Sequence, residues 1–288
     1  MIHLIEIIYA FLAGIVQGIT EWLPISSTGH LILLDSLFNI ESLGKDFVNM
    51  FDVVIQFGSI LAIVGLYFRR LNPFAPSKSK EEKKSTWSLW GKILIAAVPA
   101  GVIGIILDDF LDEKVFADPQ RNFIIAGALI FYGILFIVIE RRHRGKLYRI
   151  EDPEDIDGKT ALGIGAFQVL ALIPGTSRSG STIIGSTILG VSRKAAAEFS
   201  FFLAIPVMLG ASVLKIAKFV LDAEGGITAA FSANELIVLA IGTVVSFLVS
   251  LVAVKFLVSF VRRHSFEAFG WYRIALGIIV IIFFAFIK

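Results

Sequence analysis

Cysteine is absent from the 288 residues, and charged residues are scarce at 17%. Without cysteine the chain has no disulfide, no thiolate nucleophile and no cysteine-ligated metal. The formal net charge is only +2, and the basic residues form short clusters between apolar runs, which argues against a nucleic-acid partner. What is there is apolar: 56% of the residues are hydrophobic and the mean hydropathy is +0.83. This composition predicts an all-α polytopic membrane protein.

Two polar stretches interrupt the apolar runs. The first, PISSTGH, covers residues 24–30, and the second, PGTSRSGST, covers residues 174–182. The apolar runs beside the second stretch, 161–173 and 183–191, are each too short to cross a bilayer, which takes roughly 20 residues. Both regions therefore predict re-entrant hairpins, at about 2–38 and about 161–191. Broken backbone at membrane depth is tolerated only inside protein or along a wet cavity, so the two loops indicate a cavity.

The two hairpins begin an internal repeat. A shift of 151 residues superposes Gly14 on Gly165, Gln17 on Gln168 and Ser26 on Ser177. A hairpin returns to its own side whereas three spans change sides, so the second repeat should run inverted within one membrane domain, 1–288. The first repeat is 1–144, with spans at about 47–68, 88–107 and 122–139. The second repeat is 158–288, with spans at about 199–220, 235–260 and 270–287.

The charges between the spans agree with this topology. Lysine and arginine cluster in segments 69–92, 141–149, 193–194 and 262–263. These segments are expected to face the cytoplasm, whereas alternate loops are acidic or nearly neutral, as at Asp112 and Glu113. Both termini should therefore lie outside a multi-pass cell membrane protein. The hairpins then enter from opposite faces and can meet near the midplane.

Polar side chains of the first hairpin share helix faces. Gln17 and Glu21 are four residues apart, and Ser27 and His30 are three apart on the helix that follows. One hairpin can thus present an amide, a carboxylate, a hydroxyl and an imidazole. Ionisable groups at membrane depth are costly and indicate function. The expected partner of Glu21 is a divalent cation or Arg178, and the alternative is a purely structural Glu21–Arg178 pair that joins the hairpins.

The loop of the second hairpin has the composition of an oxyanion site. Arg178 supplies planar donors suited to phosphate, and a helix that starts near Ser179 adds free N–H groups and its positive dipole end. The serines could instead be only helix caps. The residues expected to bind phosphate in the two loops are Ser26, Thr28, Gly175, Thr176, Ser177, Ser179, Gly180 and Thr182.

These motifs resemble the bacterial undecaprenyl-pyrophosphate phosphatase family, also called bacitracin-resistance proteins. The likeness rests on QGITE at 17–21, PISSTGH at 24–30, PGTSRSGST at 174–182 and SRKAAAEFSF at 192–201, and it covers essentially the whole chain. The resemblance implies an enzyme of the bacterial cell membrane that removes the terminal phosphate of undecaprenyl pyrophosphate. That reaction regenerates the lipid carrier of peptidoglycan synthesis and is associated with bacitracin resistance.

The same resemblance implies roles for single residues. Glu21, Ser27, His30 and Arg178 match the family's essential residues, and activity in the family depends on a divalent cation. From its chemistry, Glu21 is expected to bind this cation, Mg²⁺ or Ca²⁺, or to act as base. The family often has glutamate at the position of Gln17, so this amide is expected to support the site rather than to act as a base. Ser27 is the first choice for nucleophile or water-orienting hydroxyl, and His30 for the acid–base group. Attack by His30 or by water stays open.

A secondary transporter, such as a polyprenyl-phosphate flippase, is the alternative function. Inverted repeats with broken helices at the midplane are also a transporter plan. A transporter needs an anion site and gates, but no hydroxyl–imidazole pair beside the anion. The expected partners are the polyprenyl pyrophosphate substrate and membrane lipid, without nucleic acid, and the oligomeric state stays open, a homodimer included.

Overall fold

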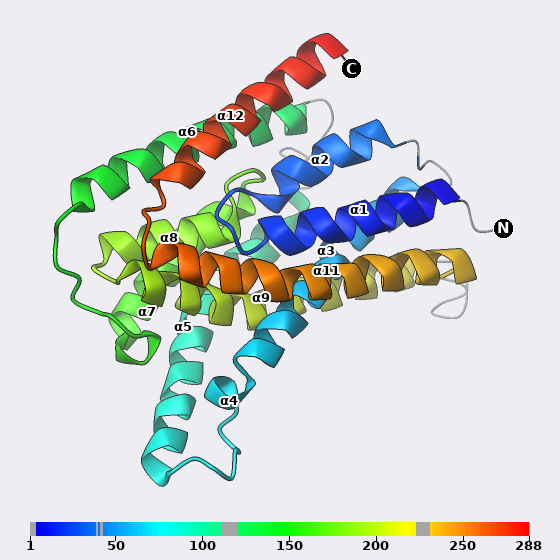
Figure 1. Ribbon diagram of the computed structural model, residues 1–288. Helices are drawn as coiled ribbons and strands as arrows, with labels where there is room; N and C mark the ends of the chain where they lie inside the picture. Colours follow the sequence, from blue (N-terminus) through cyan, green and yellow to red (C-terminus); the bar gives the residue numbers. More distant parts are fainter. Residues whose placement is uncertain (1–3, 39, 41–42, 111–119, 223–230, 288) are drawn as a thin grey trace.

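The computed structural model describes residues 4–38, 40, 43–110, 120–222 and 231–287, and nearly all of them lie in helices or short turns between helices (Figure 1). The first half contains α1 (Leu4–Thr20), α2 (Ser27–Leu37), α3 (Lys45–Leu66), α4 (Phe68–Leu71), α5 (Lys80–Phe110) and α6 (Gln120–His143). The second half contains η3 (Pro153–Asp155), α7 (Gly158–Gln168), η4 (Val169–Leu172), α8 (Arg178–Ile188), α9 (Arg193–Asp222), α11 (Ala233–Val261), α12 (Glu267–Ile282) and η5 (Phe283–Ile287).

Six of the described helices are long and apolar enough to cross a membrane, namely α3, α5, α6, α9, α11 and α12. Each of them overlaps one of the spans predicted from the sequence. The shorter α1 and α7 each lead through a polar loop into α2 and α8. The acidic loop at Asp112 and Glu113 lies outside the described residues. The chain therefore has the predicted class, an all-α polytopic membrane protein.

Side chains next to the helix starts determine where several helices begin. Asp157 accepts a hydrogen bond from the Thr160 N–H at 2.7 Å and caps α7. At the start of α11, Ser232 and Glu235 form a reciprocal capping box. Because the first turn of a helix has N–H groups without intrahelical acceptors, these side chains stabilise the starts locally.

Helices from the two halves of the chain pack directly against each other. α1 lies along α11, α11 along α3, α3 along α9, α5 along α7 and α6 along α12 (Figure 1). A Cβ on Gly14 of α1 would lie 2.7 Å from the carbonyl oxygen of Gly242 on α11, and one on Gly165 of α7 would lie 2.3 Å from that of Ala96 on α5. Only glycine permits backbones to approach this closely, so these small residues join the halves.

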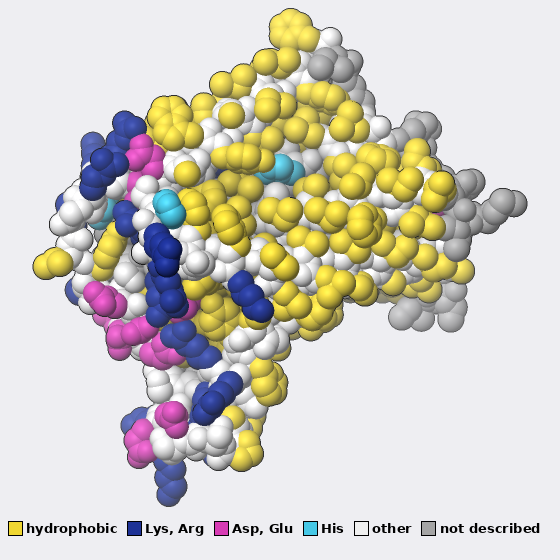
Figure 2. Space-filling model, in the orientation of Figure 1, with side chains coloured by type: hydrophobic (Ala, Val, Ile, Leu, Met, Phe, Trp, Pro, Cys, Tyr) yellow, Lys and Arg dark blue, Asp and Glu magenta, His cyan; other side chains and the backbone are white. Residues whose placement is uncertain are grey.

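Charged side chains gather at one end of the molecule, and the rest of the visible surface is mostly hydrophobic (Figure 2). The start of α1 and the end of α12 lie toward the opposite end (Figure 1). At the charged end Arg70 binds both Glu154 and Glu198, and Arg193 binds Glu140 at 2.7 Å. Because Glu140 and Glu198 are almost fully buried, these pairs join α4, α6 and α9 beneath the charged surface.

Candidate active site

The tips of the two hairpins meet inside the molecule. The Arg178 guanidinium, at the start of α8, donates to the Glu21 carboxylate at the end of α1 over 3.0 Å. Beside this ion pair the Ser179 hydroxyl donates to the Glu21 carbonyl oxygen at 3.1 Å. Residues about 157 positions apart in the chain thus form one polar site.

Equivalent serines shape both tips. Ser26 and Ser177 have φ angles of 71° and 72°, the only non-glycine residues with positive φ among those that the structure describes. Each side chain caps the following helix, Ser26 by accepting from the Gly29 N–H at 3.4 Å and Ser177 by accepting from the Gly180 N–H at 3.2 Å. The starts of α2 and α8 therefore adopt the same strained geometry, and both direct first-turn N–H groups and positive dipole ends toward the site.

Glu21 is the centre of the hydrogen bonds in the site. One carboxylate oxygen accepts from Arg178, and the other accepts from the Gln17 amide at 3.0 Å and from the Ser27 hydroxyl at 3.2 Å. The side chain is 8% exposed. The predicted neighbours Gln17, Glu21, Ser27 and Arg178 are therefore brought together, and the carboxylate is placed to accept the Ser27 proton.

Arg178 is held in one orientation by three groups. Besides Glu21, it donates to the Ser200 carbonyl oxygen at 2.7 Å and to the Ser200 hydroxyl at 3.1 Å, and its guanidinium lies 5.8 Å from the centre of the Trp22 ring. Its Nε–H has no hydrogen-bond partner within the described residues. Ser200, which lies on α9 within the motif 192–201, was not among the predicted site residues. This side chain fixes the guanidinium while leaving donors for a ligand.

His30 is bound on both sides of its ring. Its Nδ1 lies 2.7 Å from the Ser26 carbonyl oxygen, and its Nε2 lies 2.8 Å from the Tyr272 hydroxyl. A carbonyl can only accept, so the neutral ring carries its proton on Nδ1, and Nε2 accepts from Tyr272. The two rings also stack, with centroids 5.6 Å apart and planes 14° apart. Among the described hydrogen bonds none joins His30 to Ser27; the hydroxyl predicted to share a helix face with the imidazole donates to Glu21.

The residues predicted to bind phosphate separate into two groups by exposure. Thr176, Ser179 and Thr182 are at most 1% exposed; the Thr182 hydroxyl, for example, donates to the Ser200 hydroxyl at 2.7 Å. Gly175 and Gly180 are also buried, as is the Ser26 cap, so these six residues shape the site from behind. The residues of the two loops that keep partial exposure, and can meet a ligand directly, are Ser27, Thr28, His30, Ser177 and Arg178.

Arg273 of α12 ties the two tips together. Its guanidinium donates to the carbonyl oxygens of Gly175 at 2.8 Å, Thr176 at 2.9 Å and Pro24 at 3.2 Å, and the residue is completely buried. Because it binds backbone carbonyl oxygens of both loops, it orients the backbone that carries the site residues. Arg273 was not among the predicted site residues, although an arginine inside the predicted span 270–287 is a costly group that signals a role.

Comparison with known proteins identifies the family of this chain. The family model described as bacitracin resistance protein BacA matches residues 10–279. The chain belongs to the BacA family. Relatives named undecaprenyl-diphosphatase include those of Enterococcus faecalis, 53% identical over 94% of this chain and 95% of the relative, and of Latilactobacillus sakei, 48% identical over 96% and 97%. That of Acetivibrio thermocellus is 51% identical over 98% of both chains. The resemblance inferred from the two loop motifs is thereby confirmed.

The BacA resemblance implies a divalent cation, and the site offers few ligands for one. Among the described residues no group of three or more histidine, aspartate and glutamate side chains could hold a metal. Among the side chains described at the hairpin tips, Glu21 is the single carboxylate, and the Gln17 amide oxygen beside it is buried with no hydrogen-bond partner in the described part of the chain. A carboxylate and an amide oxygen fit Mg²⁺ or Ca²⁺ in kind, but most ligands of such an ion would have to be phosphate oxygens and water.

Proposed function

We propose that this chain is a membrane-embedded undecaprenyl-diphosphatase that hydrolyses undecaprenyl pyrophosphate to undecaprenyl phosphate and inorganic phosphate. The observation that carries this function is the contact of Glu21 with both Arg178 and Ser27 between two helix N-termini. Phosphoryl transfer needs a positive group, here the Arg178 guanidinium, together with oriented N–H groups and a hydroxyl beside a carboxylate. The reaction returns the lipid carrier to peptidoglycan synthesis and accounts for the family's link to bacitracin resistance.

In the proposed reaction, Arg178 and the first-turn N–H groups of α2 and α8 hold the diphosphate oxygens. Ser27 attacks the terminal phosphorus, its proton passes to Glu21, and the bond to the bridging oxygen breaks with departure of undecaprenyl phosphate. Water, which gives a proton to His30, then attacks the phosphorus of the phosphoserine, the Ser27 oxygen takes its proton back from Glu21, and inorganic phosphate departs. The Glu21–Ser27 hydrogen bond at 3.2 Å supports Ser27 as nucleophile with Glu21 as its base.

A divalent cation in this site would neutralise charge on the diphosphate. Glu21 and the Gln17 amide oxygen would hold it from the protein side, and the substrate's own oxygens and water would complete its shell. The Glu21 carboxylate would bind the cation and accept the Ser27 proton at different stages of the reaction. The substrate's oxygens would therefore be the principal ligands of the cation.

The two halves of the chain are proposed to be inverted repeats. The packing supports this, because α1 corresponds to α7 and α5 to α11 in the two proposed repeats. α1 of the first half lies on α11 of the second, and α7 of the second half lies on α5 of the first. A second support is the crossing of α6 and α12, where a Cβ on Gly133 would be 2.8 Å from the Gly270 carbonyl oxygen and one on Gly270 would be 2.7 Å from that of Gly133. Such a reciprocal contact is expected at a two-fold axis. With the basic end in the cytoplasm, both termini face outward.

Phosphate release from a purified substrate tests the function. The full chain in detergent, supplied with undecaprenyl pyrophosphate and Mg²⁺, should release inorganic phosphate, and Ser27→Ala should reduce the rate at least about a hundredfold because the nucleophile is removed. A chelator should abolish release, and added Mg²⁺ or Ca²⁺ should restore it.

The exposed Ser88→Ala variant is the matched control, since it removes a hydroxyl far along the chain from both loops. It should retain the wild-type rate. Absence of phosphate release with every divalent cation, together with lipid movement across vesicles that contain the chain, would instead favour the transporter.

Removing the Tyr272 hydroxyl should impair the acid–base group without unfolding the chain. Tyr272→Phe keeps the ring that stacks on His30 but loses the donor to Nε2, so the imidazole loses its fixed orientation. We expect kcat to fall about tenfold, in the range of a misplaced acid–base group, with little change in KM or melting temperature. Tyr148→Phe, which removes a hydroxyl at the charged end, should leave kcat unchanged. Equal kcat values for the two variants would contradict the role given to Tyr272.

A further inference from the structure

A second polar cavity lies apart from the hairpin tips, between the end of α3 and the last turns of α11. Its volume is about 410 Å³. The lining residues are Leu66, Tyr67, Val254, Lys255, Val258, Ser259, Arg262 and Arg263. The cavity thus has an apolar wall and three cations, without any carboxylate in its lining. None of these residues has a part in the diphosphate site.

The three cations are free to bind a ligand. Lys255, Arg262 and Arg263 are exposed, and their side chains make no hydrogen bond or ion pair with the described residues. Other cations at the charged end are already bound: Arg70 to two glutamates and Arg193 to Glu140. Arg262 and Arg263 directly follow the last residue of α11, where positive charges compensate the helix dipole. It does not explain Lys255, which stands two turns earlier on an apolar helix.

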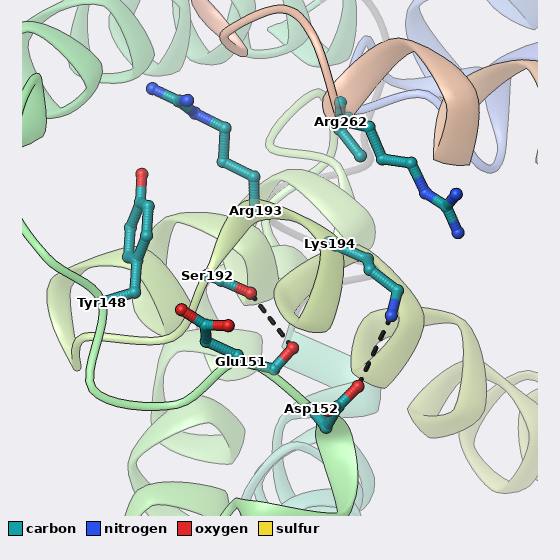
Figure 3. A pocket seen from close by; sticks show the side chains of 8 residues that line it. Tyr148, Glu151, Asp152, Ser192, Arg193, Lys194 and Arg262 are labelled. Atoms are coloured by element: carbon teal, nitrogen blue, oxygen red, sulfur yellow. Dashed lines mark hydrogen bonds and ion pairs between the residues drawn. The ribbon is translucent and has the colours of Figure 1, made fainter.

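A neighbouring cavity of about 360 Å³ provides a contrast (Figure 3). It shares Arg262 but is also lined by Glu151 and Asp152. Its other cations are engaged, Lys194 with Asp152 at 3.4 Å and Arg193 with Glu140. In Figure 3 the Arg262 side chain points away from Tyr148 and Arg193. With two carboxylates in its lining and two of its cations already paired, this mixed cavity is not suited to an anion.

The positions of the cations on α11 match a lipid that lies along the helix. Lys255 and Arg262 are seven residues apart, so they share a face and are separated by about 10 Å along the axis. Val254 and Val258 line the same cavity, and Val254 is 1% exposed. Lys255 can bury its aliphatic chain and raise its ammonium group toward the headgroup level. Basic side chains stand at the border of the hydrophobic surface (Figure 2).

We propose that this cavity binds one anionic phospholipid of the inner leaflet, with the phosphate between Lys255, Arg262 and Arg263 and an acyl chain against Leu66, Val254 and Val258. Basic pockets between membrane helices on the cytoplasmic side are suited to anionic headgroups. The phospholipid stabilises the contact of α3 with α11, the helix on which α1 of the catalytic hairpin lies.

Native mass spectrometry of the purified full chain tests the site. The detergent-solubilised protein is mixed with equal amounts of phosphatidylglycerol and phosphatidylcholine that carry the same acyl chains. We expect one phosphatidylglycerol to be retained about tenfold in excess, and the triple variant Lys255→Gln, Arg262→Gln, Arg263→Gln to lose this preference. Val258→Trp, which fills the apolar half without a change of charge, should lower retention of phosphatidylglycerol to a similar degree.

The matched control is Arg69→Gln, Arg142→Gln, Lys146→Gln, which removes three exposed charges from the same end outside the cavity lining. It should retain the wild-type preference, and all variants should keep the wild-type melting temperature. An equal loss of the preference for phosphatidylglycerol in the control would show that the preference comes from general surface charge, and would overturn the proposal. So would displacement of the lipid by millimolar inorganic phosphate, preferential retention of undecaprenyl phosphate, or undiminished binding to Val258→Trp.

Discussion

Replacing Arg178 with lysine should lower kcat for phosphate release by about a thousandfold while the chain stays folded. Three of the five guanidinium donors are committed, one to Glu21 and two to Ser200, which leaves the Nε–H and one further N–H for a phosphate oxygen. An ammonium group is a single point of charge and cannot hold Glu21, Ser200 and the diphosphate together. Rates measured at saturating substrate for wild type and Arg178→Lys give the effect directly.

Two comparisons separate this role from a purely structural Glu21–Arg178 pair. If the pair only joined the hairpins, Arg178→Lys would lower the melting temperature, and the folded fraction would keep its turnover. Arg141→Lys is the control, because Arg141 binds Glu267 at the exposed charged end at 2.6 Å. It should change kcat less than twofold. Retention of more than a tenth of the wild-type kcat by Arg178→Lys would refute the catalytic assignment.

Much of the site could be predicted because its determinants are local. Gln17 and Glu21 meet because they are four residues apart at the end of one helix, and their bond is 3.0 Å long. Ser26 and Ser177 act as N-caps because each stands at the end of a proline-containing loop, directly before the start of a helix. The Glu21–Arg178 contact required a further step, namely that a charge at membrane depth needs a partner. The predicted inverted repeat was the reason to expect that the two loops meet.

The remaining contacts are long-range and have no pattern in the sequence. Tyr272 and Ser200 lie on apolar helices, and nothing in their spacing to His30 or Arg178 reveals the contact. Helical periodicity correctly placed Ser27 and His30 on neighbouring positions of one helix. It could not predict that the imidazole would bind the Ser26 carbonyl and Tyr272 while the hydroxyl bound Glu21, since side-chain orientation depends on partners from other helices.

The Arg273→Met variant should lose both stability and activity. Methionine replaces the aliphatic part of the side chain and packs adaptably, so the change removes mainly the guanidinium with its donors to the carbonyl oxygens of Pro24, Gly175 and Thr176. Each buried carbonyl left without a donor costs about 1–3 kcal/mol, which corresponds to a fall in melting temperature of about 10 °C or more for a chain of this size. Thermal denaturation in detergent measures this effect.

Arg273→Lys distinguishes the two consequences, because one ammonium group can still bind one or two of the three carbonyls. This variant should fold, yet its hairpin tips should be less firmly placed, and a displacement of about 1 Å in a catalytic group can cost about a hundredfold in rate. Arg142→Met, at an exposed position near the end of α6, should change neither property. If Arg273→Lys turned over like wild type, the buried guanidinium would be needed for folding alone, and the geometry of Glu21, Ser27 and Arg178 would be maintained by the two serine caps and the ion pair between the tips.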